Sequence, residues 1–236
     1  MHIKNLDEKE FWKDYELTRQ EVEIAIECFY TWLEINKLAS ANEKTYKALN
    51  KNPTFWNISL YGLQCSFFIV LGRIFDDGHD AHSIHKLITS CLANPQFFSK
   101  EALAKRKQED RKKPEWLDEY IENAHEPSME ELRNLNRALS HHRKRFDEIY
   151  RNIRNYVFAH RVAKKAEIVS ELFGKTKIGD IENILYFLYD LLEVIWQLYH
   201  NGRAPVLGVG EYDYKVRISG IVRSVLSVLP NKNTNA

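Results

Sequence analysis

Residues 53–75, PTFWNISLYGLQCSFFIVLGRIF, carry apolar side chains on nearly every face of a helix and no formal charge before Arg73. A helix that is apolar all round is buried by neighbours on every side. The stretch therefore predicts a helix that runs through the middle of a bundle and ends at Asp76-Asp77-Gly78. A membrane-spanning helix is the alternative. Polar residues such as Asn57 and Gln64 interrupt the apolar run and favour the buried core helix.

Helical periodicity continues on both sides of this stretch. Upstream, Asp7-x-x-Glu10 resembles a capping box that opens a long helix. Downstream, Ser128-x-x-Glu131 is a second match of this kind, and it opens a helix that extends to Ile153. The remaining expected helices span about Ala81 to Leu92, Asp180 to about Asn201, and Tyr212 to Leu229. We therefore expect an all-α helical bundle.

Length and composition indicate one domain with additions. The 236 residues, 44% of them hydrophobic, suffice for one sizeable core. We expect a helical domain over residues 1–205, a C-terminal helical segment over 206–230 and a polar tail over 231–236. Residues 99–127 differ in character, because they combine runs of Lys and Arg with two prolines. They are expected to form an exposed insertion within the domain.

Cysteine usage points to a reducing compartment. Cys28, Cys65 and Cys91 lie far apart on apolar helical stretches and form no C-x-x-C pair. This pattern is typical of buried free thiols. The first residues contain no apolar run of the signal-peptide type. Together these observations favour a cytoplasmic protein.

The residues with the clearest chemistry directly follow Ile153. They are Arg154-Asn155-Tyr156-Val157-Phe158-Ala159-His160-Arg161. An imidazole such as that of His160 has an ordinary pKa of about 6.5, so it can take a proton from a ribose 2'-hydroxyl or give one to a leaving 5'-oxygen. The Arg154 guanidinium stays charged and suits phosphate binding and transition-state stabilisation. With the Asn155 amide as an orienting group, these three residues are candidates for cleaving RNA without a metal.

Basic residues surround this motif although the formal net charge is only +1. Between Arg133 and Lys165 the chain has ten Lys or Arg residues, and its only acidic residues there are Asp147 and Glu148. A local concentration of cations attracts phosphates whatever the overall charge, although a solvated helix face is the alternative. The predicted RNA-binding residues are Arg143, Lys144, Arg145, Arg151, Arg161 and Lys164.

Two stretches resemble the HEPN superfamily, small all-helical domains that include many prokaryotic RNase toxins and abortive-infection proteins. Residues 154–160 are similar to its R-x(4–6)-H motif, with a five-residue spacer and an Asn after the Arg. The segment LGRIFDD at 71–77, followed by SIHKLI at 83–88, resembles the abortive-infection U branch of the superfamily. The resemblance covers roughly residues 8 to 200 and implies a HEPN-like bundle with an extra C-terminal helix.

The resemblance also implies a function. It predicts an endoribonuclease of toxin–antitoxin or phage-defence type that needs no metal and no cofactor. Its substrate would be RNA, cut by attack of the 2'-hydroxyl to leave a 2',3'-cyclic phosphate, and its protein partner an antitoxin. Related toxins can be silenced by nucleotidylation of a Tyr two residues after the histidine. This chain has Val162 there, so the same control is not expected.

Spacing within the motif bears on how many chains form the site. On an ideal helix, six residue steps leave Arg154 and His160 roughly 120° apart around the axis and about 9 Å apart along it. Either the helix breaks inside the motif or a second copy of the chain completes the site. The family resemblance favours a site at a homodimer interface.

Other interpretations compete with the ribonuclease. A catalytically silent HEPN module would bind RNA, a nucleotide or a partner protein and leave RNA intact. Arg154 could also be a surface cation and His160 a histidine at a helix end. A metal enzyme would use the carboxylates and imidazoles of residues 76–85, which are Asp76, Asp77, His79, Asp80, His82 and His85. The segment matches no known metal signature, so no metal ligands are predicted.

Overall fold

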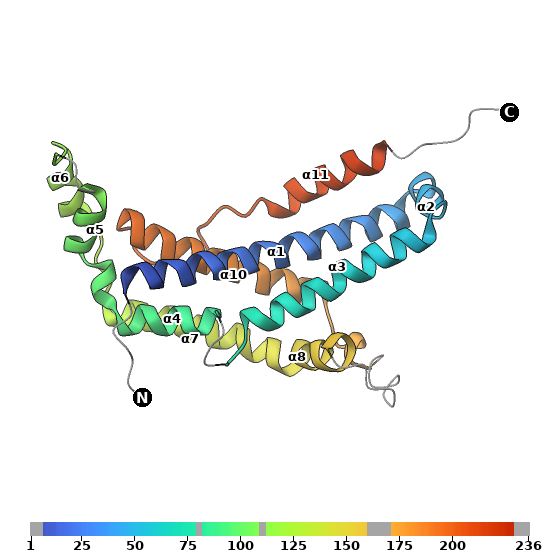
Figure 1. Ribbon diagram of the computed structural model, residues 1–236, viewed down its shortest axis with the longest axis horizontal. Helices are drawn as coiled ribbons and strands as arrows, with labels where there is room; N and C mark the ends of the chain where they lie inside the picture. Colours follow the sequence, from blue (N-terminus) through green and yellow to red (C-terminus); the bar gives the residue numbers. More distant parts are fainter. Residues whose placement is uncertain (1–6, 79–81, 109–111, 160–170, 229–236) are drawn as a thin grey trace.

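The computed structural model describes residues 7–78, 82–108, 112–159 and 171–228. All regular elements in these ranges are helical, which confirms the expected all-α fold. Helices α1 (Glu8–Ala41) and α3 (Pro53–Ile74) form a long antiparallel hairpin joined by the short α2 (Glu43–Leu49) (Figure 1). Helices α10 (Ile178–Asn201) and α11 (Tyr214–Ser227) both pack against α1.

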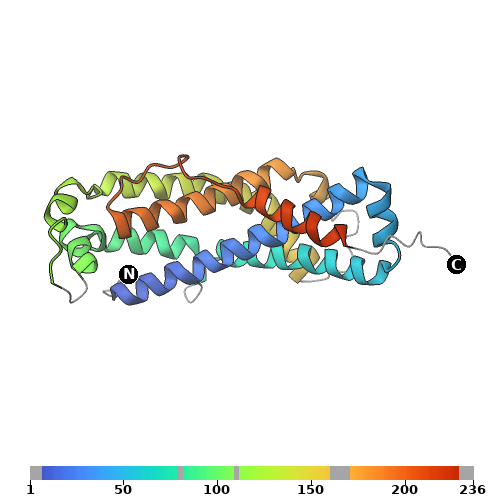
Figure 2. The same cartoon turned by 90° about the horizontal axis from the view of Figure 1, so that it is seen from above.

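The second half of the bundle contains the motif. Helix α4 (Ile84–Ala93) packs beside α7 (Met129–Arg145). After α7 the helical path continues through η2 (Phe146–Tyr150), α8 (Arg151–Ile153) and η3 (Arg154–Ala159), as Figures 1 and 2 show. Both η2 and η3 are π-helical. Such segments are rare and often lie at functional sites.

Most helix boundaries agree with the sequence pattern. The capping box that begins α7 is present, since the Glu131 backbone N–H donates to the Ser128 hydroxyl and the Ser128 N–H donates to the Glu131 carboxylate. Helix α4 begins later than expected, because the Ser83 side chain caps it. Helix α10 begins two residues before Asp180 and ends, as expected, at Gly202.

Helix α3 differs from the expectation of a helix buried on all sides. In its C-terminal half the buried residues are Phe67, Phe68, Val70, Leu71, Gly72 and Ile74. Its N-terminal half leaves Phe55, Ile58 and Tyr61 exposed by 62%, 67% and 59%, because no described element covers that side of the hairpin. By length and composition, α3 is the one described helix that could cross a membrane, and 28% of its apolar window is buried within the fold.

The insertion is anchored to the bundle rather than simply exposed. It contains α5 (Lys100–Gln108) and α6 (Leu117–Asn123), which follow the 3-10 turn η1 (Pro95–Phe98) at one end of the molecule (Figure 2). Leu103 of α5 is buried. The Arg106 guanidinium donates to the Glu8 carboxylate and to the Tyr199 carbonyl, and lies over the Tyr199 ring. These contacts tie the insertion to α1 and α10.

The C-terminal helix α11 buries only part of its apolar side chains. Tyr214, Ile218 and Val222 are buried against the bundle. Ile221 and Val225 of the same helix are 57% and 53% exposed. The predicted tail at 231–236 lies outside the described residues.

Replacing Gly202 with Ala should destabilise the contact between the insertion and α10. Gly202 has a φ of +57°, and an added Cβ would lie 2.7 Å from Leu103 Cδ2 and 2.8 Å from Ala124 Cβ. The left-handed backbone alone costs a non-glycine residue about 1–2 kcal/mol. We expect the Tm, measured by circular dichroism, to fall by roughly 2–8 °C. In the control Gly220→Ala, where no described atom lies within 4 Å of an added Cβ, the Tm should hold or rise slightly.

Candidate functional site

The Arg154 side chain packs directly against the backbone of α3. A Cβ placed on Gly72 would lie 2.8 Å from Arg154 Nε and 3.1 Å from its Cγ. The Nε atom is buried and has no hydrogen-bond partner among the described residues. At the other end of the guanidinium, Nη1 donates to the Asn155 side-chain oxygen at 3.0 Å. Gly72 and Asn155 thus hold the aliphatic part and the tip of the same side chain.

The residues that follow Gly72 fix this end of α3 in place. Arg73 contacts α1 instead of the motif segment, and its guanidinium forms a bidentate ion pair with Glu21, with N–O distances of 2.7 and 3.0 Å. Phe75 is buried and stacks on Phe146 of η2, with ring centroids 4.7 Å apart. Residues 73–75 therefore connect α1, α3 and the helical path that carries the motif, close to the point where the Arg154 side chain packs against α3.

Most of the predicted RNA-binding cations that the structure describes are already paired with carboxylates. Arg143 and Arg151 both bind Asp77, which follows α3, and both bind Asp147 one helical turn from each. Burial alone would raise the pKa of Asp77, but the hydrogen bond from Arg143 and the charges of both arginines outweigh it and hold that pKa below its ordinary value. This four-residue network carries no net charge at neutral pH.

Two further cations differ in how firmly they are held. Arg145 pairs with Asp180 at 2.5 Å. Lys144 is held more weakly, because its side chain is 78% exposed and its ammonium comes no closer than 4.0 Å to the Glu148 carboxylate. Their neighbour His142 stacks on Phe187 at 4.0 Å. Burial and the adjacent His141 lower the pKa of His142 to about 4, so it is neutral at pH 7 and adds no charge to the basic surface.

Arg154 differs from these cations, because no described carboxylate lies within 4 Å of its guanidinium. It is half-buried, and its described hydrogen bond goes to the neutral Asn155 amide. Among the described residues this guanidinium meets no counter-charge, and an anion such as phosphate would supply one with matching geometry. Among the predicted site residues, Arg154 has the environment of a ligand-binding cation.

The helix does not break between Arg154 and Ala159, because the chain continues there as a π-helix. Its hydrogen bonds join residues five apart, so the ideal-helix offset between Arg154 and His160 does not apply to this segment. Three predicted residues lie outside the described ranges, namely His160, Arg161 and Lys164. Their roles stay predictions.

The proposed metal cluster at 76–85 is not assembled by its described members. Asp77 binds Arg143 and Arg151, and Asp76 accepts the Gly78 backbone N–H. His82 binds the buried Asp14 at 2.6 Å, and Lys86 reaches the same carboxylate. No group of three or more potential metal ligands occurs among the residues that the structure describes, and His79 and Asp80 lie outside them.

Sequence reasoning missed Gly72 as a site residue. Its signal was an isolated glycine inside an otherwise apolar helical stretch, which costs helix stability and usually has a packing reason. From the sequence, Asp77 is a candidate ligand only in the alternative metal site, whereas in the structure it binds two arginines beside the motif. Sequence spacing could not reveal that Asp77 binds Arg143 and Arg151, because these contacts join residues 66 and 74 positions apart in the chain.

The described part of the chain is an all-α bundle in which a continuous helical path places Arg154 and Asn155 beside α3. The family model HEPN_AbiU2, described as AbiU2, matches residues 8–216. The chain therefore belongs to the AbiU2 family of HEPN-domain proteins, which are related to abortive infection. Comparisons with curated proteins and with solved structures give no match.

Gly72→Ala should displace the Arg154 side chain while leaving the bundle folded. The added methyl group would overlap Arg154 at 2.8 Å, but alanine is the better helix former. We expect any RNA-directed activity to fall at least about tenfold, because misplaced catalytic groups lose much of their effect. Gly220→Ala on α11, where no described atom lies within 4 Å of the added Cβ, should keep full activity. Equal activities in the two variants would show that Arg154 is not needed in this position.

Proposed function

We propose that this HEPN protein is a metal-independent endoribonuclease that acts in phage defence or as the toxin of a toxin–antitoxin pair. The observation that carries the proposal is the Arg154 guanidinium, which is half-buried, lacks a described carboxylate partner and is held by Gly72 and Asn155. The family match supports the abortive-infection setting. We place the protein in the cytoplasm, where both RNA and an antitoxin partner would be available.

The proposed chemistry assigns one role to each motif residue. Arg154 binds the scissile phosphate and stabilises the additional negative charge of the pentacoordinate transition state. His160 acts as the general acid or base, taking the 2'-hydroxyl proton or giving one to the leaving 5'-oxygen. Asn155 fixes the orientation of the guanidinium through its side-chain oxygen. The 2'-oxygen attacks phosphorus, the bond to the 5'-oxygen breaks, and a 2',3'-cyclic phosphate results.

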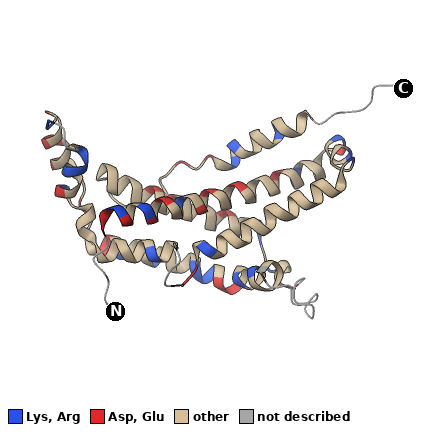
Figure 3. Cartoon of the chain, viewed as in Figure 1, with Lys and Arg blue, Asp and Glu red and all other residues tan. Residues whose placement is uncertain are grey.

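A homodimer would bring two copies of the motif together. The exposed side of α3 presents Phe55, Ile58 and Tyr61 with no charged residue among them. Figure 3 shows that α3 carries charge only near its C-terminal end, in contrast to α1. Tyr61 also contacts Phe158 of η3, so this apolar face continues into the motif segment. We propose a second copy of the chain as its partner, because pairing through this face places both motifs beside the dimer interface.

Asp77→Asn should increase RNA affinity if Arg143 and Arg151 hold phosphates. The substitution removes one of the two carboxylates that both guanidiniums bind and leaves Asp147 to neutralise two positive charges, so the pair becomes more available to RNA. In a His160→Ala background, which keeps the RNA intact, we expect the slope of log K against log salt to steepen by roughly 0.7 for each new phosphate contact to single-stranded RNA. Asp118→Asn, which removes the partner of Lys113 in the insertion, should leave the slope unchanged. An unchanged slope for Asp77→Asn would assign the network to folding alone.

Single substitutions test the catalytic assignment. His160→Ala and Arg154→Ala should each lower RNA cleavage by about 10²-fold or more, with little change in Tm. Cleavage should continue in excess chelator, since the proposed steps use no metal. A chain that shifts RNA mobility without cutting it would instead be the catalytically silent binding module. Loss of activity in EDTA with recovery on Zn²⁺ or Mn²⁺ would contradict the metal-independent mechanism.

Mixed dimers test whether the site is shared between subunits. If each site takes Arg154 from one protomer and His160 from the other, a dimer of Arg154→Ala and His160→Ala subunits has one intact site. In an equal mixture half of the dimers are of this kind, and each has one intact site where the wild type has two. Roughly a quarter of the wild-type activity should therefore return. Subunit exchange is checked by native mass spectrometry. Sites contained in single protomers would stay inactive in the mixture, and a fully active monomer in sedimentation would refute the dimer.

A further inference from the structure

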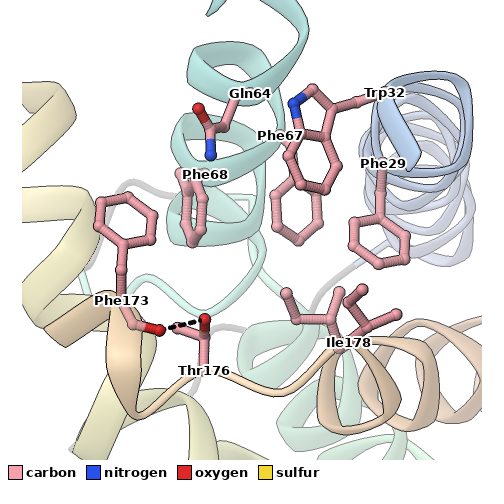
Figure 4. A pocket seen from close by; sticks show the side chains of 9 residues that line it. Phe29, Trp32, Gln64, Phe67, Phe68, Phe173, Thr176 and Ile178 are labelled. Atoms are coloured by element: carbon pink, nitrogen blue, oxygen red, sulfur yellow. Dashed lines mark hydrogen bonds between the residues drawn. The ribbon is translucent and has the colours of Figure 1, made fainter. Parts of the chain in front are cut away.

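A small cavity lies between α1, α3 and the chain that leads into α10, on the side of α3 that faces α1 (Figure 4). Its volume is about 100 Å³. The walls are predominantly aromatic, and Figure 4 shows the rings arranged around a common space. They belong to Phe29, Trp32, Phe67, Phe68 and Phe173.

The size and the walls of this cavity fit a single planar ring. A closed apolar cavity of about 150 Å³ is large enough to bind benzene. This one is somewhat smaller but partly open to solvent, so a ring could enter with its substituted edge outward. Aromatic walls form stacked or edge-on contacts with a planar aromatic ring, and these are more favourable than contacts with a non-planar saturated ring.

Polar groups occur at one end of the cavity. The Gln64 amide and the Trp32 indole nitrogen lie on the same side of the space in Figure 4. Neither group forms a hydrogen bond with another residue that the structure describes. The Thr176 hydroxyl, by contrast, already donates to the Phe173 carbonyl at 2.7 Å. A ligand with a donor or acceptor on one edge would therefore meet Gln64, whose amide offers both.

We propose that this cavity is a binding site for a small planar aromatic molecule that carries a hydrogen-bonding group on one edge, of the phenol type. The ring lies among the aromatic side chains, and its polar edge bonds to the Gln64 amide. Most binding energy in such sites comes from the apolar walls, and the few polar groups set the orientation. This site is separate from the proposed phosphate site at Arg154.

The occupied cavity would adjoin the motif segment through three phenylalanines. Phe68 stacks on Phe158 of η3 with ring centroids 4.9 Å apart and planes 15° apart. Phe173 meets Phe68 edge-on at 6.4 Å and Phe158 edge-on at 6.5 Å. Phe158 is four residues after Arg154 in the same π-helical segment. A ligand that presses on Phe68 and Phe173 would thus contact the two rings that support this segment.

Calorimetric titration of the full chain with phenol, benzene and cyclohexanol tests the proposal without any use of RNA. We expect saturable binding of one phenol per chain, at least about tenfold tighter than cyclohexanol, which has the same hydroxyl on a non-planar ring. Gln64→Leu should weaken phenol binding about five- to tenfold, the usual effect of losing one hydrogen bond, and leave benzene binding unchanged.

Thr176→Phe supplies an independent test of location. The larger side chain should fill the cavity and abolish phenol binding, with folding checked by circular dichroism. If that variant fails to fold, the contrast between phenol and benzene in Gln64→Leu decides the question. The proposal is overturned if phenol shows no saturable binding, if cyclohexanol binds equally well, if Gln64→Leu leaves phenol binding unchanged, or if a folded Thr176→Phe variant still binds phenol.

Discussion

The close approach of the Arg154 side chain to the α3 backbone at Gly72 is the contact on which the site depends. Only a residue without a Cβ leaves room there for the aliphatic part of the arginine. Flanking contacts hold the crossing in register, since Arg73 binds Glu21 on one side and Phe75 stacks on Phe146 on the other. The guanidinium is consequently presented by a rigid crossing of two helices rather than by a surface loop, which favours a preorganised site.

Helix α3 serves two purposes along its length. Its C-terminal half belongs to the core, supports Arg154 and lines the aromatic cavity through Gln64, Phe67 and Phe68, while its N-terminal half exposes apolar side chains. A helix with no charge before Arg73 satisfies both environments, because neither the core nor an apolar contact surface tolerates an unpaired charge. The same composition explains why the helix resembles a membrane span by length and hydropathy.

The charges near the motif form an ordered arrangement rather than a uniform basic patch. Asp77 and Asp147 neutralise Arg143 and Arg151 next to the point where Arg154 meets α3. Paired cations attract an anion less strongly than a cation with no carboxylate partner among the described residues, which supports the proposal that Arg154 is the phosphate-binding group. Exposed cations such as Lys144 remain available for weaker, salt-sensitive contacts.

Sequence alone determined the helical class, most helix boundaries and the family, because these follow from local patterns of period, caps and motif spacing. The Ser128–Glu131 capping box and the end of α10 at Gly202 are examples. Tertiary structure alone decided which cations are paired, which half of α3 is exposed and why Gly72 matters. Each of these depends on contacts between segments far apart in the chain, such as Asp77 with Arg143 or Arg154 with Gly72. A one-dimensional pattern cannot record such contacts, since side-chain periodicity fixes the face on which a residue lies but not the partner that face meets.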